Sequence, residues 1–99
     1  MKPVVTPMMK RIVLDMQGRT IDLQKLHDLL KSEGLYQSNY DKDSNPYCNY
    51  LELEFSGKAR LFSSGKITTN LNFPDEDLKE LFYRMQTGTI MQCLKERDK

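Results

Sequence analysis

Two near-copies of one short pattern constrain the fold most: Phe-Ser-Gly-Lys at residues 55–58 and Phe-Ser-Ser-Gly-Lys at residues 62–66. Each copy predicts a tight turn, because glycine supplies the positive φ that hairpin turns need and serine can bond to nearby backbone. The runs at residues 50–55, 59–62 and 67–71 have the length of strands. We therefore predict three consecutive antiparallel strands joined by two turns.

Two amphipathic helices are expected to cover one face of these strands. Asp22 is a candidate N-cap and Gly34 a candidate left-handed C-cap for a helix at residues 23–33, whose leucines fall on one side. A second helix is expected to begin near Pro74, because the acidic residues that follow it complement the positive end of a helix dipole. Gly88 is expected to kink or end this helix.

The pattern at residues 11–16 alternates like a fourth strand, whereas the polar stretch at residues 36–46 predicts a loop. A sheet with one apolar face needs a covering layer, which the helices supply. The expected fold is α+β: a two-layer sandwich with a curved antiparallel sheet of about four strands, ordered β-α-β-β-β-α along the chain, and two helices packed on one face.

A chain of 99 residues is long enough for one hydrophobic core and too short for two. We expect one domain at residues 10–95, preceded by an extended arm at residues 1–9 that contains two prolines and followed by a charged tail at residues 96–99. The sequence contains neither a membrane-spanning run nor the pattern of a secretion signal. We therefore expect an intracellular protein, cytoplasmic or, in a eukaryote, nuclear, with no membrane partner.

Several kinds of site are disfavoured by the residues themselves. Cys48 and Cys93 lack the spacing of a zinc site or a disulfide framework. A calcium loop is partly matched by Asp41, Asp43, Asn45 and Glu52, but Pro46 stands where the sharp turn needs glycine. No nucleophile with a base and no carboxylate pair in a cleft is recognisable. We expect no enzyme activity, no metal and no cofactor.

The order strand, helix, loop, three-strand meander, helix, together with Leu-Phe-Ser-Ser-Gly-Lys-Ile-Thr-Thr at residues 61–69, resembles one repeat of the TATA-box-binding protein family. The resemblance covers residues 10–94 and is topological outside the motif. In that family two repeats form a curved sheet whose concave face sits on the DNA minor groove, with phenylalanines wedged between base steps. This chain resembles a single repeat, so a complete saddle would require two copies.

The resemblance implies roles for individual side chains. Phe62 corresponds to a wedge, Ser64 and Lys66 to phosphate contacts, and the groove-lining positions fall on Arg11, Val13, Thr68 and Asn70. Strand alternation places Tyr50 and Arg60 on the same open face, where they could stack on bases and meet phosphate. Counting Arg11, Arg60 and Lys66 against Asp15, Glu52 and Glu54 predicts an open face without net charge.

Two functions of different classes remain open. The first is a nucleic-acid-binding or transcription-associated module that uses the open face. The second is a protein-interaction or homodimerisation module that uses the same face and binds no nucleic acid. The whole chain has 15 basic and 14 acidic residues, so its formal net charge of +1 lacks the basic excess common in proteins that hold nucleic acid through phosphate.

Overall fold

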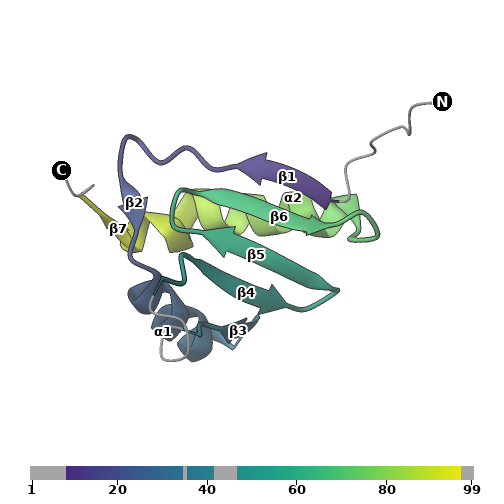
Figure 1. The fold of residues 1–99 in the computed structure, drawn as a ribbon, viewed down its shortest axis with the longest axis horizontal. Helices are drawn as coiled ribbons and strands as arrows, with labels where there is room; N and C mark the ends of the chain where they lie inside the picture. The colour runs from purple at the N-terminus through teal and green to yellow at the C-terminus, as the bar shows by residue number, and fades with distance from the viewer. Residues whose placement is uncertain (1–8, 35, 42–46, 97–99) are drawn as a thin grey trace.

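The computed structural model describes residues 9–34, 36–41 and 47–96 (Figure 1). Five antiparallel strands form the main sheet, in the spatial order β1-β6-β5-β4-β3. They are β1 (Met9–Val13), β3 (Gln37–Asn39), β4 (Tyr50–Glu54), β5 (Lys58–Phe62) and β6 (Lys66–Asn70). Together with the helices α1 (Leu23–Glu33) and α2 (Asp75–Arg84), this sheet confirms the predicted α+β class.

The predicted meander is present as β4, β5 and β6. Its second turn contains Gly65 at a φ of 93°, as expected for a hairpin glycine. The prediction for Gly57 is wrong, because this glycine does not have a positive φ. A Cβ atom at position 57 would lie 3.2 Å from the ring of Phe73, so the close approach of this ring explains the small residue there.

Helix α1 has the bounds and both caps that the sequence predicts. The Asp22 side chain accepts a hydrogen bond from the Lys25 backbone N–H at 3.2 Å. At the other end Gly34 adopts a left-handed conformation with φ 71°, and its N–H donates to the Leu30 carbonyl. The two caps satisfy backbone groups that the helix leaves without partners.

Helix α2 begins after Pro74 and changes its winding near its end. The α-helical hydrogen bonding stops at Arg84 and is followed by a π-helical turn, η1 (Met85–Thr89), and a 3₁₀ turn, η2 (Ile90–Gln92). Gly88 lies inside the π turn. The expected change of helix geometry around Gly88 is therefore seen as a wider turn, which keeps Met85 and Ile90 fully buried.

Three short strands lie where the sequence gives no strand pattern. β3 falls in the predicted loop at residues 36–46 and pairs with β4 through its main chain, for example Asn39 with Glu52. Its polar side chains suit a sheet edge, where main-chain hydrogen bonds need no apolar alternation. β2 (Thr20–Ile21) and β7 (Leu94–Lys95) form a separate antiparallel pair. Most of the partial calcium pattern, including Pro46, lies outside the described residues.

One hydrophobic core lies between the helices and one face of the main sheet. Its members include Leu26 and Leu30 of α1, Leu81 of α2, and the sheet residues Leu53 and Leu61, all fully buried. Strand β1 ends earlier than predicted, at Val13 rather than residue 16. The expected arm at residues 1–9 and tail at residues 96–99 lie almost wholly outside the described residues.

Candidate functional site

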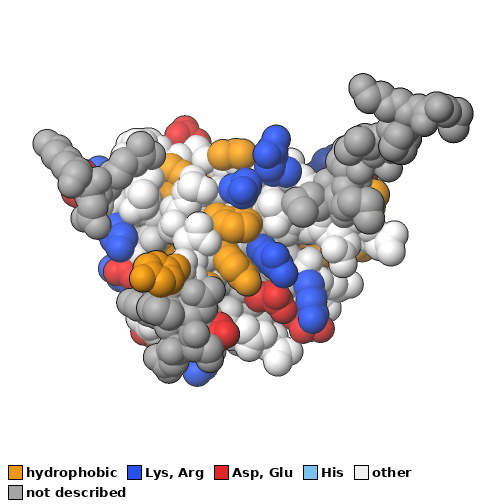
Figure 2. Space-filling view, in the orientation of Figure 1, with side chains coloured by type: hydrophobic (Ala, Val, Ile, Leu, Met, Phe, Trp, Pro, Cys, Tyr) orange, Lys and Arg blue, Asp and Glu red, His pale blue; other side chains and the backbone are white. Residues whose placement is uncertain are grey.

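The face of the main sheet opposite the helices is a candidate site. Because successive strand residues point to opposite sides, the buried positions of each strand fix which side chains lie on the other side. We call the open face the surface that these outward side chains form. Its described members are Arg11, Val13, Gln37, Asn39, Tyr50, Glu52, Glu54, Lys58, Arg60, Phe62, Lys66, Thr68 and Asn70. Figure 2 views this face and shows hydrophobic side chains near its middle, with basic side chains around them.

Two aromatic rings form the centre of the open face. Tyr50 of β4 and Phe62 of β5 are directly opposite in the register, and their ring centroids lie 5.4 Å apart at an interplanar angle of 45°. The Arg60 guanidinium carbon lies 5.0 Å from the Tyr50 centroid, and Lys66 Nζ lies 4.4 Å from the Phe62 centroid. Both distances are in the range of cation–π contacts. Phe62 is half-buried by these neighbours and does not lie beneath the helices.

The charge of the open face differs from the prediction. Asp15 lies beyond the end of β1, where its backbone N–H donates to Gln86 Oε1 at 2.7 Å and its carboxylate accepts from the Gln17 N–H. Lys58, which the sequence reading left out, lies on the open face opposite Glu54. Among the described residues the face therefore has four basic and two acidic side chains. The prediction of a face without net charge is wrong, because the face is positively charged.

The charges are also segregated. The basic side chains come from β1, β5 and β6, and both carboxylates come from β4. Glu52 joins the two regions, with Oε1 lying 3.7 Å from Lys58 Nζ and Oε2 lying 4.0 Å from Arg60 Nε. An anionic ligand would therefore contact the β1–β6–β5 side of the face.

The remaining predicted residues occupy three kinds of position. Val13 is 60% exposed and lies beside Lys66 in the register, and Asn70 is exposed near the other end of β6. Thr68 is buried, because Arg11 and Arg60 lie on either side of it. Ser64 is exposed in the turn between β5 and β6, beyond the strands. The structure thus brings the strand residues together and leaves Ser64 at the rim.

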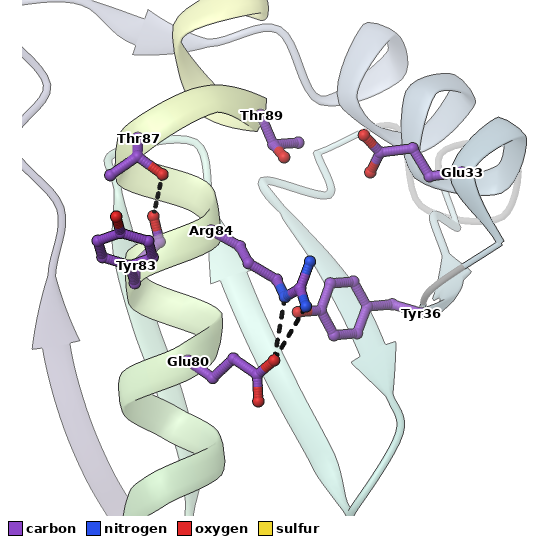
Figure 3. A pocket seen from close by; sticks show the side chains of 7 residues that line it. All are labelled: Glu33, Tyr36, Glu80, Tyr83, Arg84, Thr87 and Thr89. Carbon is purple, nitrogen blue, oxygen red and sulfur yellow. Dashed lines mark hydrogen bonds and ion pairs between the residues drawn. The ribbon is translucent and has the colours of Figure 1, made fainter.

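A cavity in the helical layer is a second candidate. It has a volume of about 420 Å³ and is lined by Glu33, Tyr36, Glu80, Tyr83, Arg84, Thr87 and Thr89 (Figure 3). Its size falls in the range of small-molecule pockets. The end of α1 forms one side, and α2 with the π turn η1 forms the other.

Three of the polar side chains that line this cavity are paired within α2 and the π turn: Glu80, Arg84 and Thr87. Arg84 donates through Nε and Nη2 to Glu80 Oε1 at 3.2 and 3.0 Å, and these hydrogen bonds raise the pKa of the guanidinium. Burial raises the pKa of the Tyr36 hydroxyl above its usual value. Thr87 Oγ1 donates to the Tyr83 carbonyl rather than to a carboxylate. The cavity can hold polar ligand groups, but the Thr87 hydroxyl, which donates to a carbonyl, is not activated as a nucleophile.

The cysteines and acidic side chains in the part of the chain that the structure describes form no further site. No group of three His, Cys, Asp or Glu side chains there could hold a metal ion. Cys48 and Cys93 are free thiols, and burial raises the pKa of Cys93. Within the same residues, the helices are too short or too polar to cross a membrane.

Comparison of the chain with protein family models, with curated proteins and with solved structures gives no match in any of the three. The features of the chain that bear on function are the geometry of the open face and the motif at residues 61–69.

Proposed function

We propose that this chain is a small binding module that holds single-stranded nucleic acid on the open face of its sheet. The observation that carries the proposal is the aromatic pair Tyr50–Phe62 with a cation against each ring. Sheet faces with exposed aromatic rings stack bases, and neighbouring cations neutralise the phosphates that join them.

The cations lie where a nucleic-acid backbone would need them. Arg11 and Lys66 are on neighbouring strands, β1 and β6, on the side of the face away from the carboxylates of β4. A strand of nucleic acid could place its phosphates over this side and its bases over Phe62 and Tyr50. The resemblance of residues 61–69 to the TATA-box-binding protein family supports the same face and the same phenylalanine.

A single strand fits this face better than a duplex. A wedge that opens a base step has to project from its surface. Phe62 instead packs against Tyr50 and under Lys66, so its ring does not project as a wedge. An unpaired base would stack on this ring by displacing the flexible Lys66 side chain toward a phosphate. The two carboxylates of β4 would also repel the second phosphate backbone of a duplex.

Binding of a labelled single-stranded oligonucleotide, measured by fluorescence anisotropy, tests the proposal. Phe62→Leu and Tyr50→Leu should each weaken binding by about 1–3 kcal/mol, the usual contribution of a stacked base. Tyr83→Leu is the matched control, because Tyr83 is 67% exposed and lies on α2 in the helical layer.

Charge is tested in the same assay. Lys66→Glu should weaken binding strongly, whereas Lys79→Glu, the same charge change on α2, should not. Affinity should fall between about 50 mM and about 200 mM salt because phosphate contacts release counterions. Absence of binding at the lower salt concentration would contradict the proposal.

A second function is favoured by the charge segregation. The basic region on β1, β5 and β6 and the acidic region on β4 could pair with each other across a two-fold axis, so a second copy of the chain could bind the open face. Sedimentation analysis distinguishes the two functions. A dimer that Arg60→Glu disrupts, combined with no oligonucleotide binding, would support homodimerisation.

A further inference from the structure

We propose that the open face prefers guanine among unpaired bases, and that Glu52 and Arg60 recognise it. This inference rests on the proposed function and adds a base preference to it. It uses the ion pair between two strands that lies next to the aromatic pair, and it gives Glu52 of β4 a role in binding.

The register places the two groups beside the stacking platform. Glu52 and Arg60 are directly opposite each other on β4 and β5, just as Tyr50 and Phe62 are. The two pairs are two residues apart along each strand, which corresponds to about 7 Å. A base stacked on the aromatic pair can therefore direct its hydrogen-bonding edge toward Glu52 and Arg60.

Both side chains have hydrogen-bonding capacity left for a base. The contacts of Glu52 with Lys58 and Arg60, at 3.7 and 4.0 Å, are longer than hydrogen bonds. Solvent reaches 27% of the Glu52 side chain and 55% of the Arg60 side chain. The carboxylate offers only acceptors and the guanidinium only donors, so together they select a base edge that has both kinds of group.

Guanine matches this arrangement best. Its N1–H and N2–H groups are adjacent donors that one carboxylate can bind together, and its neighbouring O6 accepts from a guanidinium. Adenine and cytosine each offer a carboxylate only an exocyclic amine. Thymine and uracil offer a single N–H between two carbonyl groups, which repel a carboxylate. The order of preference should have guanine first and thymine or uracil last.

The test compares thymidine oligonucleotides that differ in one central base. Guanine, hypoxanthine, adenine and thymine are placed at that position, and affinity for the intact protein is measured by fluorescence anisotropy. We expect the guanine oligonucleotide to bind about tenfold more tightly than the all-thymine one, within the range of a good bidentate base contact. Hypoxanthine lacks the N2 amine and should lose about half of this gain on a logarithmic scale.

Two variants connect the preference to Glu52. Glu52→Gln should abolish the preference, so that the ratio of guanine to thymine affinity falls to about one. Glu54→Gln removes the same charge two residues further along β4 from the aromatic pair and should leave the ratio unchanged. The two variants are compared by the ratio of guanine to thymine affinity. Loss of a negative charge raises affinity for every oligonucleotide, and the ratio cancels this general increase.

The outcomes separate this inference from the proposed function. Salt-dependent binding of all four oligonucleotides with equal affinity would overturn the guanine preference and leave the single-strand proposal standing. A preference that survives Glu52→Gln, or that Glu54→Gln removes equally, would overturn the assignment to Glu52. If none of the oligonucleotides binds, both proposals fail.

Discussion

Tyr50 and Phe62 contact each other across β4 and β5 on the side of the sheet that the helices leave uncovered, with ring centroids 5.4 Å apart. Neither ring belongs to the hydrophobic core or packs against it. The pair therefore contributes to stability mainly through its own contact and its two cations, and part of its surface is exposed to a ligand.

The first prediction concerns this separation of stability from binding. In a double-mutant cycle, Tyr50→Leu and Phe62→Leu should show a coupling of about 0.5–1.5 kcal/mol in the free energy of unfolding, as for other aromatic pairs. Leu61→Ala, one residue away but fully buried, should cost about 2–5 kcal/mol. Urea denaturation of the parent protein, the two single variants, the double variant and Leu61→Ala measures these free energies. If Phe62→Leu lowers the free energy of unfolding as much as Leu61→Ala does, Phe62 is a core residue.

The second prediction concerns the turn between β5 and β6. Gly65 has a φ of 93°, and a Cβ atom there would lie 2.6 Å from Met16 Cγ. Gly65→Ala should therefore destabilise the fold by at least about 1–3 kcal/mol, from backbone strain and from displacement of the Met16 side chain. Thermal denaturation monitored by circular dichroism measures the loss.

Gly88→Ala is the control for this substitution. Gly88 lies in the π turn with a negative φ, and a Cβ atom there meets nothing within 4 Å. It should leave stability unchanged or raise it by about 0.5–1 kcal/mol, because alanine loses less backbone entropy in a helical conformation. Equal losses at positions 65 and 88 would contradict the argument from the turn.

The third prediction concerns the start of α1. Asp22→Ala removes the side-chain acceptor of the Lys25 N–H and should cost about 1 kcal/mol in the free energy of unfolding. Asp28→Ala is the comparison, because Asp28 is exposed within the helix and accepts only from the Gln24 side chain. It should cost less, near the value of about 0.2–0.5 kcal/mol for a helix surface pair. A larger loss at Asp28 would argue against the cap.

The sequence predicts those parts of the fold that local chemistry determines. The bounds of α1 follow from Asp22 and Gly34, whose caps act within a few residues. The meander follows from strand alternation and from Gly65. β3 could not be predicted, because edge pairing by main-chain groups leaves no pattern in polar side chains. The β2–β7 pair joins segments from opposite ends of the chain, and nothing in either segment indicates the other.

The candidate site shows the same division. Alternation along β4 and β5 is enough to place Tyr50, Arg60 and Phe62 on one face. The charge of that face depends on where β1 ends and where β5 begins, and shifts of one to a few residues removed Asp15 and added Lys58. Tertiary contacts with Gln86 hold Asp15 away from the strand, and these contacts span 71 positions in the chain.

The last prediction concerns pH and the link between β1 and α2. Lys10 Nζ donates to the Asp75 carboxylate and, at 2.6 Å, to the Phe73 carbonyl. The hydrogen bond from Lys10, with its positive charge, lowers the pKa of Asp75 below its usual value. The folded state therefore binds a proton at Asp75 less readily than the unfolded state. The stabilising effect is present above the usual aspartate pKa of about 3.9 and is lost as the pH falls through the lower folded value.

Asp75→Asn tests this linkage. At neutral pH the substitution should lower the midpoint of urea denaturation. As the pH falls from about 3.9 through the lower folded value, the difference between the variant and the parent protein should shrink toward zero. Glu76→Gln is the control, because it removes an acidic charge from the same first turn of α2 without removing the Lys10 contact. Both substitutions weaken the interaction with the helix dipole, but only Asp75→Asn removes the ion pair between Lys10 and α2. If the midpoints of Asp75→Asn and the parent protein still differ by the same amount at acidic pH, the carboxylate does not stabilise the fold through its charge.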